Sequence, residues 1–216
     1  MNLLIFDLDG TLVDSKLDLV HSVNAARGLM TLAPISEELV SSYVGSGVVV
    51  LMRRALGADA SEADVERAVE FFLGYYRDHM LDNTRLYPSV QEALDRIRES
   101  GARMAVLTNK PVRFSRAIVE GLGLGGHFFQ VYGGNSFDQK KPDPIGIEKL
   151  LEESGIARER AIMVGDSGVD VRTARNAKVR ACGVSYGFQP ESFEQDPPDF
   201  VVDDMNELAD YLLAGF

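Results

Sequence analysis

The stretch "LLIFDLDGTLVD" (residues 3–14) places two carboxylates, Asp7 and Asp9, directly after an apolar run. Carboxylates at the end of a buried strand are costly unless they are paired, bind a metal or take part in chemistry. If the backbone stays extended, residues 7 and 9 point the same way and Leu8 points to the opposite side. Gly10 then allows the chain to bend. The stretch therefore predicts a buried strand that ends in two acidic groups with a common target.

Further apolar runs recur along the chain, and helical periodicity fills most of the gaps between them. Such alternation indicates an α/β fold, a Rossmann-like parallel sheet with helices on both faces. The predicted strands span residues 2–6, 103–107, 128–132, 161–164, 180–184 and 199–202. Helices are predicted for residues 89–100, 143–155 and 168–178. Ser89 and Glu92 form an expected capping box at the start of the first of these helices.

Residues 15–87 hold no convincing strand and are too many for an ordinary crossover between strands. Helical patterns cover residues 16–29, 36–44, 47–56 and 61–80, with Ser36 and Ser61 as expected N-caps. We therefore expect an α/β core formed by residues 1–14 and 88–216, with an all-α cap domain inserted at residues 15–87. Hinges are expected near residues 12–16 and 85–88.

The composition is that of a soluble globular protein, with 216 residues, of which 45% are hydrophobic and 25% charged. A net charge of −11 opposes binding to nucleic acid and to anionic membranes. No apolar run approaches the length of a membrane span, so we expect a cytoplasmic protein. We also expect a monomer or a weak dimer. The single cysteine, Cys182, excludes an internal disulfide framework and lies in a predicted buried strand.

Polar groups follow four of the predicted strands, at the edge where ligands bind in open parallel sheets. In chain order these groups are Asp7 and Asp9, then Thr108 and Asn109, then Lys140 and Lys141, then Asp166 and Asp170. The first two acids and Asp166 would form the oxygen-rich site that Mg²⁺ prefers. A threonine hydroxyl and a lysine are donors for a phosphate. Because clustered carboxylates repel an anionic substrate, a divalent cation is expected there.

The opening pair of acids makes sense if one is a nucleophile and metal ligand while the other moves protons. Hydrolysis of phosphate monoesters is among the slowest uncatalysed reactions and needs accelerations of up to ~10²¹-fold. General acid–base catalysis supplies only ~10²–10⁴-fold. Covalent catalysis, leaving-group protonation, Mg²⁺ and a lysine would therefore have to act together.

Four segments in chain order resemble the four motifs of the haloacid dehalogenase-like phosphatases. They are "FDLDGTLVDS" (6–15), "LTNK" (107–110), "KKPDP" (140–144) and "VGDSGVD" (164–170). With the helical insert, the resemblance covers nearly the whole chain. Within this superfamily the phosphoglycolate phosphatases are the most similar, through "YVGSGVVVLMRRAL" (43–56), "TNKP" (108–111) and "SYGF" (185–188). The resemblance implies a small phosphorylated metabolite as substrate, with 2-phosphoglycolate as the first candidate.

The resemblance also implies roles for the acids. Asp7 would attack phosphorus and form an aspartyl-phosphate, and Asp9 would protonate the leaving group and then activate water. Mg²⁺ would be bound by Asp7, the main-chain carbonyl of Asp9 and Asp166, with Asp170 behind them.

The remaining motif residues would bind the substrate. Thr108, the amide of Asn109 and Lys141 would hold the phosphoryl oxygens, and residues 43–47 match a specificity loop on the cap. One of Arg53, Arg54 or Lys110 could pair with a carboxylate of the substrate.

Several functions remain open at this point. A phosphosugar mutase, a pyrophosphatase or a nucleotidase of the same superfamily would use the same core motifs, and a non-catalytic phosphate-binding regulatory module could keep the fold. The mutase and a phosphonate hydrolase of this superfamily are both less favoured. The phosphonate enzymes use a cap lysine, and residues 15–87 contain only Lys16. Two positions depart from the family pattern. Val169 replaces a frequent asparagine, and Lys178 stands where relatives usually have glycine.

Overall fold

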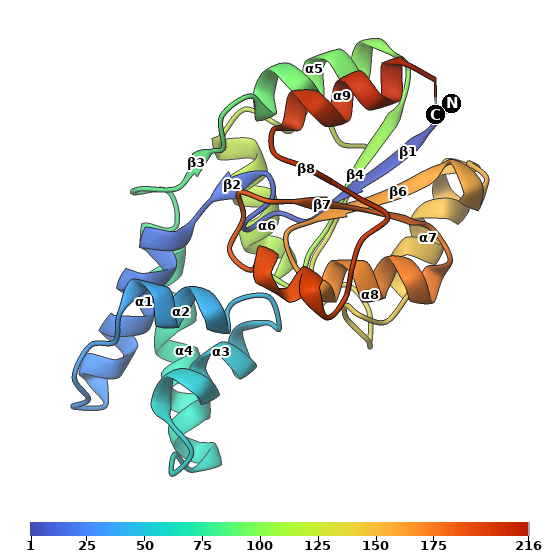
Figure 1. The fold of residues 1–216 in the computed structure, drawn as a ribbon. Helices are drawn as coiled ribbons and strands as arrows, with labels where there is room; N and C mark the ends of the chain where they lie inside the picture. The colour runs from blue at the N-terminus through green and yellow to red at the C-terminus, as the bar shows by residue number, and fades with distance from the viewer. Residues whose placement is uncertain (216) are drawn as a thin grey trace.

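The structure is a computed structural model that describes residues 1–215. Its centre is a six-stranded parallel sheet with the strand order β5-β4-β1-β6-β7-β8 (Figure 1). The α/β fold predicted from the sequence is confirmed. The strands are β1 (Leu3–Phe6), β4 (Arg103–Leu107), β5 (Gln130–Tyr132), β6 (Ala161–Gly165), β7 (Arg180–Val184) and β8 (Phe200–Val202).

Side chains of β1 alternate between two cores, one on each face of the sheet. Leu4 and Phe6 pack in one hydrophobic cluster, and Leu3 and Ile5 pack in the other. This alternation follows from the two-residue period of a strand and explains why the whole run is apolar. The first cluster is covered by α5 (Val90–Glu99), α6 (Val112–Gly121) and α9 (Met205–Leu213), and the second by α7 (Ile145–Ser154) and α8 (Gly168–Ala177). Figure 1 shows α5 and α9 on the side of the sheet opposite to α7 and α8.

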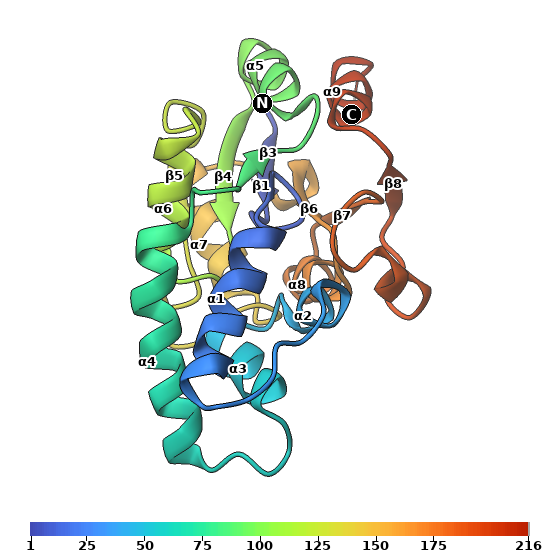
Figure 2. The same cartoon turned by 90° about the vertical axis from the view of Figure 1, so that its left-hand side faces the viewer.

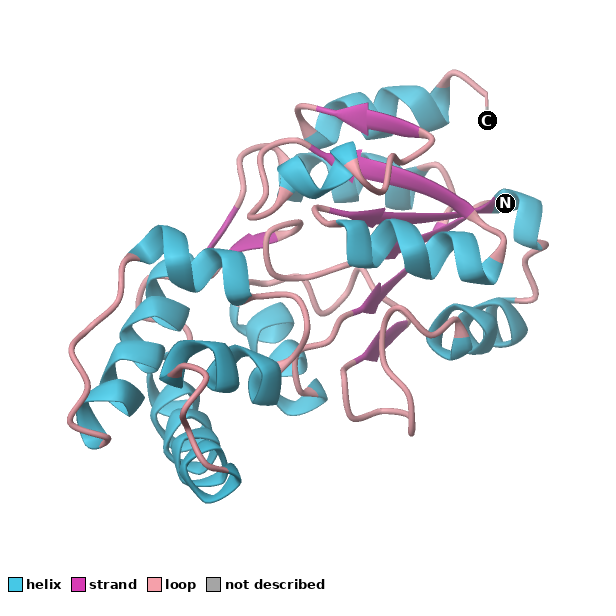
Figure 3. Cartoon of the chain, turned by 60° about the horizontal axis from the view of Figure 1, so that its bottom comes forward, coloured by secondary structure: helices cyan, strands magenta, loops and turns pink. Residues whose placement is uncertain are grey.

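Four helices, α1 (Lys16–Leu29), α2 (Glu37–Tyr43), α3 (Val48–Leu56) and α4 (Glu62–His79), lie to one side of the sheet (Figures 1 and 3). We call residues 16–79 the helical segment. Its helices share a hydrophobic cluster, to which Phe114 of α6 also belongs, and α1 packs along α4 (Figure 2). The predicted N-caps are present, because Ser36 Oγ accepts from the Leu39 amide (3.3 Å) and Ser61 Oγ accepts from the Asp64 amide (3.1 Å).

The chain enters and leaves the helical segment through two short strands, β2 (Val13–Asp14) and β3 (Arg85–Leu86), which pair antiparallel. A buried carboxylate, Asp18 of α1, lies beside this pair. It accepts hydrogen bonds from both main-chain and side-chain groups of Asn83 and Thr84, at 2.7–3.0 Å. Hydrogen bonds therefore connect the two chain segments that link the helical segment to the rest of the protein.

The capping box expected from Ser89 and Glu92 is wrong. A capping residue needs an extended backbone, but Ser89 has a φ of 65° and its hydroxyl donates to Asp204 at the start of α9 (2.8 Å). Because α5 packs against α9, the Ser89 hydroxyl bonds to Asp204 and does not cap the start of α5. Lys178 has a φ of 55°, the left-handed conformation in which glycine is usual. Cys182 is buried, and no helix within residues 1–215 is long and apolar enough to cross a membrane.

Candidate active site

Three adjacent strands of the sheet, β4, β1 and β6, end at the same edge, and a polar residue follows each of them. β1 is hydrogen-bonded to β4 on one side and to β6 on the other. Asp7, Thr108 and Asp166 are the residues that directly follow these three strands. Parallel pairing therefore brings together residues that are far apart in the sequence.

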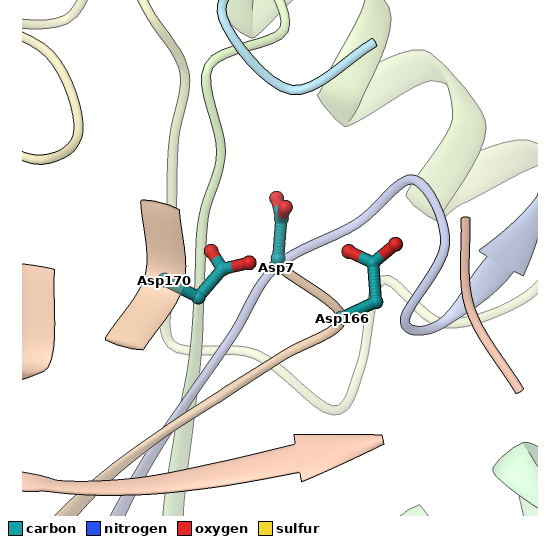
Figure 4. Close-up of side chains that lie close together, drawn as sticks. All are labelled: Asp7, Asp166 and Asp170. Atoms are coloured by element: carbon teal, nitrogen blue, oxygen red, sulfur yellow. The ribbon is translucent and has the colours of Figure 1, made fainter. Parts of the chain in front are cut away.

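A cluster of three buried carboxylates lies at this edge, formed by Asp7, Asp166 and Asp170 (Figure 4). One oxygen from each carboxylate lies within 4.8 Å of one oxygen from each of the others. Asp170 sits in the first turn of α8, where its Oδ2 accepts from the amide of Ser167 (3.2 Å) and from its hydroxyl (2.7 Å). The helix start therefore fixes the orientation of this third carboxylate.

Lys141 lies between two of these acids. Its Nζ is 3.0 Å from Oδ1 of Asp7 and 2.6 Å from Oδ1 of Asp170, and its side chain is 1% exposed. Burial alone would lower the pKa of Lys141, but the negative charges of Asp170 and Asp7 outweigh burial and raise it. Lys141 therefore stays a cation inside the site.

Three carboxylates and one ammonium leave this cluster with a formal charge of −2 when all four groups are ionised. Burial raises the pKa of Asp7 to about 6, although Lys141 acts in the opposite direction. Burial, with Asp170 and Asp7 nearby, raises the pKa of Asp166 well above its usual range. The cluster by itself thus favours protons, and a divalent cation would balance the same charge. Oxygen donors, burial and charge fit a hard ion such as Mg²⁺.

Two glycines make room for Asp166. Gly10 has a φ of 79°, and both Gly10 and Gly187 approach Asp166 so closely that a Cβ on either would overlap its side chain. The amide of Phe188 donates to Oδ2 of Asp166 (2.7 Å). The "DG" turn after β1 and the "SYGF" loop after β7 therefore support the same carboxylate.

Asp9 lies apart from this acidic cluster and has different partners. Ser15 Oγ donates to its Oδ1 (2.5 Å), and Lys110 Nζ lies 2.8 Å and 3.0 Å from its two carboxylate oxygens. The same Nζ donates to the hydroxyl of Tyr76 on α4 (2.6 Å). The side chain of Asp9 is 10% exposed and that of Lys110 only 6%. The hydrogen bond to Tyr76 thus joins this buried ion pair at the sheet edge to the helical segment.

Members of both groups line one pocket. Asp7, Asp9 and Asp166 line it with Thr108 and Asn109, and the helical segment contributes much of the rest of the lining. The apolar part of the lining includes Val48, Leu51, Phe72, Tyr76, Phe114 and Phe188. Asn109 connects the two sides, because its Nδ2 donates to the carbonyl of Gly45 (2.9 Å) and to that of Lys141 (3.0 Å). With a divalent cation held by these acids, the pocket would suit a small ligand with an anionic end.

The sequence placed Asp7, Asp9, Thr108, Asn109, Lys141, Asp166 and Asp170 around one site, and the structure brings these residues to the same edge. Arg53 and Arg54 do not line the pocket, and Arg53 pairs with Glu62 on the surface (2.6 Å). Sequence reasoning missed Tyr76, because nothing in the α4 pattern distinguishes it from the other apolar residues of that helix.

Comparison with known proteins identifies the family. The family model of the haloacid dehalogenase-like hydrolases matches residues 4–184. A phosphoglycolate phosphatase of Vibrio parahaemolyticus is 37% identical over 222 residues, covering 100% of this chain and 97% of its own. A phosphoglycolate phosphatase of Agrobacterium fabrum is 38% identical, with coverages of 95% and 90%.

Solved structures agree with the sequence relatives. A crystal structure of a predicted phosphoglycolate phosphatase from Haemophilus somnus superposes with a TM-score of 0.92, at 32% identity, over 98% of both chains. The chain therefore belongs to the haloacid dehalogenase-like hydrolases, in which it is a phosphoric monoester hydrolase similar to the phosphoglycolate phosphatases.

Proposed function

We propose that this protein is a Mg²⁺-dependent phosphatase that hydrolyses a small phosphomonoester, 2-phosphoglycolate, through an aspartyl-phosphate on Asp7. The observation that carries the proposal is the position of Lys141 between Asp7 and Asp170, in a cluster whose other acids, Asp7 and Asp166, line the pocket. The names of the sequence relatives support the choice of substrate.

Asp7 is the proposed nucleophile. Its Oδ1 accepts from the amide of Leu8 (2.7 Å) and contacts Lys141, whereas no hydrogen bond within residues 1–215 engages its Oδ2. One carboxylate oxygen is thus held while the other can act. Attack of Asp7 on phosphorus breaks the bond between phosphorus and the ester oxygen, and a carboxylate–phosphate bond forms.

Asp9 is the proposed acid and base. It gives a proton to the leaving ester oxygen, and then takes a proton from the water that attacks the phosphoryl group and releases phosphate from Asp7. Asp9 lines the same pocket as Asp7, and its contacts with Ser15 and Lys110 fix its orientation.

The phosphoryl oxygens are proposed to bind the hydroxyl of Thr108, the main-chain amide of Asn109 and Nζ of Lys141. Mg²⁺, when held by Asp7, the main-chain oxygen of Asp9 and Asp166, would neutralise charge on the phosphate. Asp170 then serves to hold Lys141 in place (2.6 Å).

Residues 15–87 are proposed to act as a cap on a core of residues 1–14 and 88–216. Three core side chains donate to carbonyl groups between α2 and α3. Asn109 donates to Gly45 (2.9 Å), Lys140 to Ser46 (2.7 Å) and Gln189 to Val44 (2.7 Å). Together with the hydrogen bond from Lys110 to Tyr76, these few contacts are compatible with a cap that closes over the pocket and opens again by breaking them.

The proposal is tested by measuring phosphate release from a panel of phosphometabolites, with Mg²⁺ and after chelation. The panel contains 2-phosphoglycolate, a phosphosugar, pyrophosphate and a nucleoside monophosphate, and Asp7→Asn serves as the inactive control. We expect Mg²⁺-dependent release that is fastest from 2-phosphoglycolate and absent in Asp7→Asn.

Other outcomes would point to other functions. Preference for pyrophosphate or the nucleotide would replace the proposed substrate, and isomerisation of the phosphosugar without phosphate release would indicate a mutase. Absence of turnover with every compound would favour a phosphate-binding regulatory module.

A further inference from the structure

Lys110 is the one lysine or arginine among the residues that line the pocket, within the part of the chain that the structure describes. Lys141 is not among the lining residues, and the acids that its Nζ contacts within residues 1–215 are Asp7 and Asp170. A substrate would bind Lys141 and the metal through its phosphate. If it carries a second anionic group, Lys110 is the cation in the pocket lining that can bind that group.

The ammonium of Lys110 lies at the boundary between the proposed chemistry and the wall of the cap. It contacts both carboxylate oxygens of Asp9 (2.8 and 3.0 Å) and the hydroxyl of Tyr76 (2.6 Å). It also lies 4.5 Å from the centre of the Tyr76 ring. Because the Tyr76 hydroxyl accepts from Lys110, its own hydrogen remains to donate, and no hydrogen bond that it donates is found within residues 1–215.

Position limits which substrate atom Lys110 can reach. A general acid lies about 2.6–3.2 Å from the oxygen that it protonates. Lys110 in turn lies 2.8 Å from Asp9. The contact from the ester oxygen to Asp9 and the contact from Asp9 to Lys110 together place the ammonium within about 6 Å of the ester oxygen. A carboxylate attached to the first carbon beyond that oxygen falls in this range, and a group several carbons further on does not.

We propose that Lys110, together with the Tyr76 hydroxyl, is the specificity-determining pair that binds a leaving-group carboxylate one carbon from the ester oxygen. The inference rests on the proposed phosphatase function and explains how a short, acidic leaving group is selected in an otherwise apolar pocket. Lys110 shares its donors between Asp9 and the substrate carboxylate, so substrate binding also holds the ester oxygen next to Asp9. Tyr76 belongs to α4, so only the closed cap completes the pair.

The test compares two esters that differ in one group. In 2-phosphoglycolate the first carbon beyond the ester oxygen carries a carboxylate, and in ethyl phosphate it carries a methyl group. We expect Lys110→Met to reduce the ratio of kcat/KM for 2-phosphoglycolate to that for ethyl phosphate by about 10- to 100-fold, the size of a lost charge-assisted hydrogen bond. Because each ratio is taken within one enzyme, differences in the intrinsic reactivity of the two esters cancel between variants.

Two further variants make the result specific. Tyr76→Phe keeps the ring and removes the hydroxyl, and should reduce the same ratio by a smaller factor, mainly through KM. Lys140→Met is the matched control, because Lys140 is also a core lysine that contacts the cap, through the carbonyl of Ser46 (2.7 Å), but it does not line the pocket. The ratio of kcat/KM values for the two esters in Lys140→Met should equal that of the wild type.

The outcomes separate this inference from the proposed function. If Lys110→Met slows both esters by the same factor, or Lys140→Met shifts the ratio equally, Lys110 only orients Asp9 and the specificity role is wrong. If Lys110→Met does not fold, an unchanged ratio in Tyr76→Phe overturns the proposed pair. If the wild type hydrolyses neither ester with Mg²⁺, the proposed substrate is wrong, and this inference fails with it.

Discussion

Lys141 Nζ lies 3.0 Å from Oδ1 of Asp7, although the two residues belong to motifs that are far apart in the sequence. The same Nζ contacts Asp170, so one buried cation separates two carboxylates that would otherwise repel each other. This contact connects the opening "DLDG" stretch to the "KKPDP" loop and to the first turn of α8. It also gives the proposed nucleophile a fixed direction.

Replacing this cation tests its role. We expect Lys141→Met to lower kcat by about 10²–10³-fold, the usual cost of removing a donor that stabilises transition-state charge. Because the variant makes the cluster more negative, the Mg²⁺ concentration for half-maximal activity should not rise. A magnesium titration of the residual activity measures both quantities. An unchanged kcat would show that Lys141 has no part in the chemistry.

Proton and metal should compete for the acidic cluster. The pKa of Asp7 is raised to about 6, so between its unfolded value and about 6 the folded protein binds the extra proton. Without a cation, stability therefore decreases as the pH rises through this window. Mg²⁺ needs the ionised carboxylate, so its stabilising effect should be large at about pH 7.5 and should decrease progressively below about pH 6.

Thermal denaturation with and without Mg²⁺ across this pH range checks the competition. Asp7→Asn should lose most of the Mg²⁺-dependent increase in Tm at every pH. A Mg²⁺ effect that stays constant from about pH 5 to about pH 8 would place the metal away from these carboxylates.

Gly187 should tolerate no side chain. A Cβ at this position would overlap Asp166 and the main-chain oxygen of Gly10, so Gly187→Ala must displace the proposed metal ligand. We expect a loss of about 1–3 kcal/mol in the free energy of unfolding and weaker Mg²⁺ activation. Gly74→Ala is the control, because a Cβ at this position in α4 would meet no atom within 4 Å and alanine favours helices. Equal behaviour of the two variants in urea denaturation would contradict the packing described for Asp166.

Asp18 should stabilise the base of the helical segment. Burial pushes the pKa of Asp18 up, but hydrogen bonds from Thr84 and Asn83 outweigh burial and lower it. In Asp18→Asn the side-chain amide would face the N–H and O–H donors of Asn83 and Thr84 and could not accept from all of them. We expect the free energy of unfolding to fall by about 1–3 kcal/mol. The lowered pKa means that the stabilisation is present above the unfolded pKa and lost as the pH falls through the folded one.

Urea denaturation of Asp18→Asn at neutral and acidic pH measures this contribution. The exposed Asp59 offers the matched control, since Asp59→Asn changes the same charge without breaking the network. If the two variants were equally stable at neutral pH, the hydrogen bonds to Asp18 would contribute nothing measurable.

Much of the fold could be predicted because local patterns determine it. The apolar run before Asp7 is a central strand, and the helices α2 and α4 begin within a residue of their predicted N-caps. The convergence of Asp7, Lys141 and Asp166 also follows from the rule that ligands bind at the carboxyl ends of parallel strands.

The features that were missed depend on tertiary contacts. Ser89 donates to a residue at the start of α9 in place of its own helix, and the two-residue strands β2 and β3 are too short to show a period. The pairing of Lys110 with Tyr76 joins the sheet edge to α4, and no spacing within either motif reveals which helix lies opposite.

The most direct test of the central claim is to detect a phosphoryl group on Asp7. A rapid acid quench of Asp9→Asn with p-nitrophenyl phosphate suits this purpose, because nitrophenolate leaves without protonation while the step that needs a base is slowed. We predict a burst of nitrophenolate and, by peptide mass spectrometry, a phosphorylated peptide that contains Asp7 and is absent after the further change Asp7→Asn. No burst, or a phosphoryl group on another residue, would contradict the account.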